Sequence, residues 1–184
     1  MFRAAIINDI LSNSAGATVV YHFFRDSQRE SLAEVLRHLA YQYLSLLTAT
    51  SKIAVDLYRK RKASKGSLLP KELVDIICEI ALTSGRAYIV LDGVDEFPHF
   101  AKLMKHLPQF IRAKAHVLIS SRDIPSIKNF LSDAALLDAR ADEADIESYA
   151  SWRLEEDCGL DYAVFTTDLK RKICSKLVEH VNGS

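Results

Sequence analysis

The 184-residue sequence has no net charge, few cysteines and no long apolar run. Lysine plus arginine and aspartate plus glutamate number 24 each, so overall charge favours neither nucleic acid nor an anionic membrane as a partner. No apolar stretch approaches the ~20 residues of a membrane-spanning helix, and the apolar patch near the N-terminus is too short for a signal peptide. We therefore expect no nucleic-acid partner and no membrane insertion.

The three cysteines (Cys78, Cys158 and Cys174) are odd in number and widely spaced. No CxxC motif or Cys/His cluster is present, so the sequence supports neither a zinc site nor a disulfide framework. Reduced thiols are typical of intracellular proteins, which predicts a cytoplasmic location. The six histidines form no pattern with a serine or cysteine nucleophile, and we interpret them as surface or core residues.

Short apolar runs alternate with amphipathic segments along most of the chain. This alternation is typical of an α/β fold with a parallel sheet. We expect an α/β core over residues 1–141 and a helical segment over residues 142–184. Strands are expected at 18–24, 88–91, 115–120 and, weakly, 134–139. Helices are expected at 2–12, 70–84, 100–107 (ended by Pro108), 125–131, 142–158 and 169–181, and a capping box at Ser27–Glu30 is expected to open another helix. Residues 51–66 are expected to be irregular.

One of these strands runs directly into acidic residues. The apolar run 88–91 is followed by Asp92, Asp95 and Glu96, with Gly93 allowing a sharp turn. A continuous apolar run predicts a strand buried on both faces, and ligands bind at the carboxyl ends of such strands in open α/β sheets. The acids are therefore expected at a ligand-binding edge, although a solvated loop would also explain them.

Magnesium coordination is the chemistry that we assign to Asp92. Mg²⁺ takes oxygen ligands, keeps several waters and bridges a carboxylate to nucleotide phosphates. Glu96 could orient or deprotonate an attacking water, with Asp95 as a second acidic candidate.

The strand at 115–120 ends in a second polar group, Ser120, Ser121 and Arg122. The guanidinium of Arg122 matches phosphate oxygens and could sense or neutralise a γ-phosphate. An ion pair with Asp95 or Asp123 is the alternative role of Arg122.

Together, the segments YIVLDGVDE (88–96) and HVLISSR (116–122) resemble the Walker B and sensor 1 segments of NACHT domains, which are P-loop nucleotide-binding switches of the STAND class. The resemblance covers most of the chain. It implies that Asp92 binds Mg²⁺, that Asp95 and Glu96 are the additional catalytic acids, and that Ser121 and Arg122 contact ATP or GTP. It also implies a signalling function and association with itself or with intact NACHT proteins.

The sequence departs from NACHT domains in having no G-x-x-x-x-G-K-[ST] motif, which supplies the phosphate-binding loop. The segment 1–14 resembles the helix that follows that loop, so we expect a fragment of a NACHT-type domain. The expected fold is a partial three-layer P-loop NTPase fold whose mostly parallel sheet lacks its P-loop strand. Nucleotide binding and hydrolysis are expected to be weak or absent in the isolated chain.

Two other functions remain open. The chain could be a non-catalytic interaction or oligomerisation scaffold derived from a NACHT domain. It could also be an unrelated Mg²⁺-dependent hydrolase that uses Asp92, Asp95 and Glu96 alone.

Overall fold

The computed structural model describes residues 2–14, 16–25, 29–47, 51–63, 66–132, 134–137, 143–157 and 167–182. The chain divides into two compact units, residues 1–133 and residues 134–184, and each is described by itself. The division expected at residue 141 stays a prediction.

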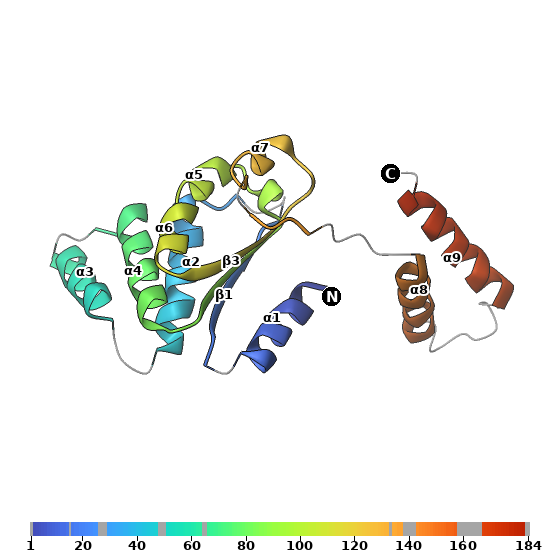
Figure 1. Ribbon diagram of the computed structural model, residues 1–184, viewed down its shortest axis with the longest axis horizontal. Coiled ribbons are helices and arrows are strands. Elements are labelled where there is room, and N and C mark those ends of the chain that lie inside the picture. Colours follow the sequence, from blue (N-terminus) through green and yellow to red (C-terminus); the bar gives the residue numbers. More distant parts are fainter. Residues whose placement is uncertain are drawn as a thin grey trace. The chain divides into compact units, whose positions relative to one another are not determined.

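The first unit contains a three-stranded parallel sheet in the order β1-β2-β3 (Figure 1). All three strands therefore end at the same edge of the sheet. The elements of this unit are α1 (Phe2–Asn13), β1 (Thr18–Phe23), α2 (Leu32–Leu46), α3 (Lys52–Ala63), α4 (Pro70–Thr83), β2 (Ala87–Asp92), the 3₁₀ helix η1 (Val94–Glu96), α5 (Phe100–Met104), α6 (Leu107–Arg112), β3 (Ala115–Ser120) and α7 (Pro125–Lys128).

Helices cover both faces of the sheet. On one face α2, α4 and α6 pack against the strands and form the main core, which includes Leu36, Ile77, Ile89 and Phe110. On the other face α1 packs against β1, with Ile7 buried in a smaller cluster (Figure 1). The predicted α/β fold with a parallel sheet is thus confirmed, and the central strand β2 is covered on both sides, as its continuous apolar run indicates.

The outer edge of β1 is closed by a side chain of α2. The Gln42 carboxamide oxygen accepts from the Tyr21 N–H at 3.0 Å, and its NH₂ group donates to the Tyr21 carbonyl at 2.8 Å. The amide therefore occupies the backbone groups to which another strand would bind.

The N-terminus of α2 lies four residues beyond the predicted cap at Ser27. Ser31 is the N-cap: its hydroxyl accepts from the Glu34 N–H, and the Glu34 carboxylate accepts from the Ser31 N–H at 2.7 Å. Ser27 lies outside the described residues. The other partner expected in that box, Glu30, lies before the helix with its carboxylate 2.7 Å from His22. Of the two consecutive S-x-x-E patterns, 27–30 and 31–34, the second one caps the helix.

Three other expectations are wrong. Residues 52–63 form α3 rather than an irregular segment. Ala54 and Leu57 of this helix pack against the main core, and the Arg61 guanidinium binds the Glu72 carboxylate of α4 through two nitrogens, at 2.9 and 2.8 Å. Pro108 lies in the first turn of α6 instead of ending a helix, a position where its missing N–H is harmless. Residues 134–137 form no strand, since this alanine- and leucine-rich segment has low β-propensity; residues 138 and 139 lie outside the described part.

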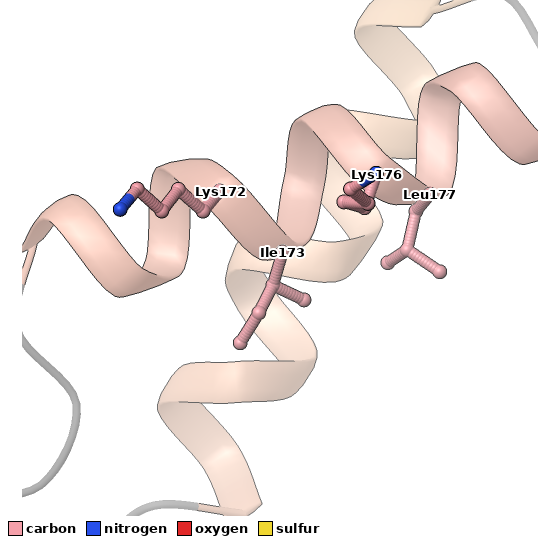
Figure 2. A pocket seen from close by; sticks show the side chains of 4 residues that line it. All are labelled: Lys172, Ile173, Lys176 and Leu177. Carbon is pink, nitrogen blue, oxygen red and sulfur yellow. The ribbon is translucent and has the colours of Figure 1, made fainter.

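The second unit contains α8 (Glu143–Asp157) and α9 (Thr167–Asn182), as the predicted helical segment requires. Ala150 and Cys174 are buried where the two helices pack. On α9 a shallow hollow is lined by Lys172, Ile173, Lys176 and Leu177, and Figure 2 shows the Ile173 and Leu177 side chains projecting to the same side of the helix. Within the described residues, no helix is long and apolar enough to span a membrane.

Replacing Ser31 with alanine removes the side-chain oxygen that caps α2. We expect the free energy of unfolding to fall by about 1 kcal/mol, measured by denaturant unfolding. The matched control is Ser45→Ala in the last turn of the same helix, where an exposed hydroxyl donates to the Gln42 carbonyl. The control should change stability by less than about 0.5 kcal/mol. Equal losses in the two variants would contradict the assignment of the cap.

Candidate functional site at the strand ends

Parallel pairing aligns the last residues of β2 and β3. In this register Asp92 lies opposite Ser120. The Ser120 hydroxyl donates to Asp92 Oδ1, and the Asp92 residue is only 7% exposed. A buried carboxylate is unfavourable unless its oxygens accept hydrogen bonds, and β3 supplies one donor in the required place.

The turn after Asp92 is fixed by the same residue of β3. The Gly93 N–H points at both the backbone oxygen and the hydroxyl oxygen of Ser120, each at 3.1 Å. Gly93 has a φ of +73°, which favours glycine, and a Cβ atom built there would lie 3.4 Å from the Phe24 carbonyl. The sharp turn starts η1, which carries Asp95 and Glu96 at the sheet edge.

Asp95 and Arg122 connect the ends of the same two strands. Arg122 Nε donates to Asp95 Oδ2 at 2.5 Å, and the Arg122 N–H donates to Asp95 Oδ1 at 3.2 Å. The Asp95 side chain is 4% exposed, whereas that of Arg122 is 78% exposed. Burial works to raise the pKa of the Asp95 carboxyl, but the hydrogen bonds from Arg122 outweigh it, so the pKa lies below its usual value.

The predicted site residues therefore lie at one edge of the sheet, but they differ in burial and in hydrogen-bond partners. Asp92, Asp95 and Arg122 lie there, and the ion pair with Asp95 that we considered as an alternative role for Arg122 is present. Glu96 is half-buried on η1. Ser121 is exposed and its hydroxyl donates to the Arg122 carbonyl, so its role as a cofactor-binding residue stays a prediction.

The sequence pattern alone assigned no role to Ser120. Successive side chains of a strand point to opposite faces, so only one of two adjacent serines can contact Asp92. Aligning the polar ends of the two apolar runs would have identified it, because Asp92 and Ser120 each come last in an equally long strand.

Neither of the two hollows that stand out on the surface lies at the strand ends. One is the α9 hollow of Figure 2. The other lies between α3 and α4, where its lining includes the apolar residues Ile53, Leu57 and Leu82. Among the described residues, no three or more His, Cys, Asp or Glu side chains are grouped closely enough to hold a metal ion.

The fold and the strand-end site define an α/β protein with polar groups at the carboxyl edge of a parallel sheet. The sequence model of the family described as Nephrocystin 3, N-terminal, matches residues 1–122, and the chain belongs to this family. The match spans most of the first unit, including every candidate site residue up to Arg122. It is a match to a family other than NACHT. Comparison with curated proteins and with solved structures gave no match.

The Asp95–Arg122 pair predicts a pH dependence of stability. Because the pKa of Asp95 is lower in the folded chain than the value of about 3.9 in an unfolded one, the pair stabilises the fold above about pH 4. This stabilisation is lost as the pH falls through the lowered pKa. In denaturant unfolding at a series of pH values, the stability difference between the wild type and Asp95→Asn should be constant near neutral pH and shrink below about pH 4.

The control for this prediction is Asp123→Asn. Asp123 pairs with Lys128 at 2.8 Å, but both side chains are more than half exposed, so we expect a loss of less than about 0.5 kcal/mol. A stability difference for Asp95→Asn that persists unchanged into strong acid would show that the Asp95 charge contributes nothing.

Proposed function

We propose that the first unit is the part of a nucleotide-binding signalling domain that positions magnesium and the terminal phosphate, as in the NACHT domains that its motifs resemble. The observation that carries this proposal is the buried Asp92 carboxylate at the carboxyl edge of a parallel sheet, where ligands of open α/β folds bind. Membership of the Nephrocystin 3, N-terminal, family is compatible with the proposal and does not identify a ligand.

The donor set suits Mg²⁺ better than a transition metal. One carboxylate from Asp92 and the nearby hydroxyl of Ser120 are oxygen groups, and Mg²⁺ in nucleotide sites uses one or two carboxylates together with phosphates and waters. Bound magnesium would neutralise charge on the β- and γ-phosphates. Asp92 would hold the ion, Ser120 would orient the Asp92 carboxylate, and Glu96 on η1 would orient a water.

Arg122 would act as a phosphate sensor that Asp95 holds in the absence of nucleotide. The guanidinium is largely exposed while its carboxylate partner is buried, so Arg122 can change partner without uncovering the core. A γ-phosphate offers the same bidentate geometry as a carboxylate and more charge. Asp95 would then act by positioning Arg122, and Glu96 would be the better candidate for water activation.

The sequence contains no G-x-x-x-x-G-K-[ST] motif, so it lacks the backbone nest and lysine that hold the phosphates in P-loop proteins. Each lost charge-assisted hydrogen bond lowers affinity by about 1.5–3 kcal/mol. We therefore propose weak binding of Mg²⁺-ATP or Mg²⁺-GTP by this chain alone, slow or absent hydrolysis, and a cytoplasmic signalling role.

Titration of the chain with ATP and with GTP, with and without Mg²⁺, tests this proposal. We expect weak binding that requires Mg²⁺, and Asp92→Asn should weaken it by roughly 10- to 100-fold because one charge-assisted contact is lost. Asp123→Asn, which removes an exposed carboxylate just beyond β3, is the matched control and should bind like the wild type. Binding that is tight, indifferent to Mg²⁺ and unchanged in Asp92→Asn would overturn the proposal.

A non-catalytic scaffold is the second candidate, favoured by β3. Its apolar residues Val117, Leu118 and Ile119 are only half-buried, and among the described residues β3 pairs with β2 alone. An unpaired strand edge beside half-exposed apolar side chains favours association with another chain. Concentration-dependent association without nucleotide, measured by analytical ultracentrifugation together with absent nucleotide binding, would support the scaffold over the nucleotide switch.

A further inference from the structure

A histidine buried beneath α2 belongs to none of the chemistry described above. His22 lies on β1 between Val20 and Phe24, on the face that α2 covers, and is 4% exposed. Its Nε2 is 2.7 Å from Glu30 Oε2, and its Nδ1 is 3.2 Å from Nδ1 of His38 on α2. Three polar side chains therefore meet at the edge of the core: His22 from β1, Glu30 from the segment before α2, and His38 from α2.

The hydrogen-bond roles in this cluster follow from the carboxylate. An ionised Glu30 can only accept, so His22 Nε2 carries a proton and donates it. In neutral His22 the Nδ1 atom is then an acceptor, and the proton between the two rings must come from His38 Nδ1. The Nδ1 lone pair of His22 is thus held facing the Nδ1 atom of His38.

We propose that His22 and His38 form a binding site for one borderline divalent transition-metal ion, such as Zn²⁺, with Glu30 as the group that orients His22. Zn²⁺ binds imidazole nitrogen at about 2.0–2.1 Å, so two nitrogens in a tetrahedral site lie about 3.3–3.4 Å apart. The two Nδ1 atoms are 3.2 Å apart, which is close to this separation. An ion binds both once the two rings turn so that their Nδ1 lone pairs point at the ion instead of at each other.

Metal binding at this pair conserves the protons of both histidines. When the metal ion takes the place of the shared proton, that proton moves from Nδ1 to Nε2 of His38, and neutral His38 keeps one proton. His38 is exposed, so the relocated N–H can donate to water. His22 keeps its Nε2 proton on Glu30, which is the carboxylate–histidine–metal arrangement that raises the basicity of a ligand.

Two protein ligands leave the remaining positions of the ion to water or to a small ligand. The exposed side of His38 is where those positions are open to solvent. Imidazole nitrogen favours zinc, copper and nickel over magnesium, which prefers oxygen. The histidine site and the carboxylate of Asp92 would therefore select different ions.

The test is calorimetric titration of the whole chain with Zn²⁺ in the presence of excess Mg²⁺. We expect one Zn²⁺ per chain, loss of this binding in His38→Gln, and affinity about 10- to 100-fold weaker in Glu30→Gln. His116→Gln is the matched control, because His116 is exposed on β3 and stacks on Tyr88 away from the pair. Asp92→Asn should also leave zinc binding unchanged, which separates this site from the proposed nucleotide site.

A measurement on the wild type makes the outcome independent of how the variants fold. The ring-nitrogen NMR signals of His22 and His38 should shift together as Zn²⁺ is added, and those of His116 should not. Zinc binding that survives His38→Gln, that is lost equally in His116→Gln, or that leaves the His22 signals unmoved would overturn the proposal.

Discussion

The candidate site depends on one hydrogen bond, from the Ser120 hydroxyl to the Asp92 carboxylate. Asp92 is nearly buried, and an ionised carboxyl group in that position requires a donor that is already in place. The donor is available only because β2 and β3 pair in parallel with their last residues opposite each other. A shift of one residue in this pairing would turn Ser120 to the other face of the sheet.

The same edge contains a second connection of the same kind. Asp95, two residues beyond the Gly93 turn, accepts from both the side chain and the backbone of Arg122, just beyond β3. Two carboxylates, one at the end of β2 and one just beyond it, therefore each accept hydrogen bonds from groups at or beyond the end of β3. The Asp92 end of this edge is nearly buried, whereas the guanidinium of Arg122 is largely exposed.

The sequence predicted features that depend on local pattern. Apolar runs that end in polar residues identified the strands and placed Asp92 and Arg122 at one edge. Features that depend on long-range contacts were not predicted: α3 is anchored by the ion pair between Arg61 and Glu72, 11 residues apart. The pair of His22 and His38 spans 16 residues and joins a strand to a helix, so no local spacing signals it. The functional roles of the site residues stay predictions.

A double-mutant cycle between Asp92 and Ser120 tests the central interaction most directly. Unfolding free energies of the wild type, Asp92→Asn, Ser120→Ala and the double variant give the coupling between the two side chains, whatever each substitution does alone. Residues in one hydrogen-bond network couple by about 0.5–3 kcal/mol, and we expect a favourable coupling within this range. Additive effects, with no coupling beyond error, would contradict the account, since Asp92 would then not depend on β3.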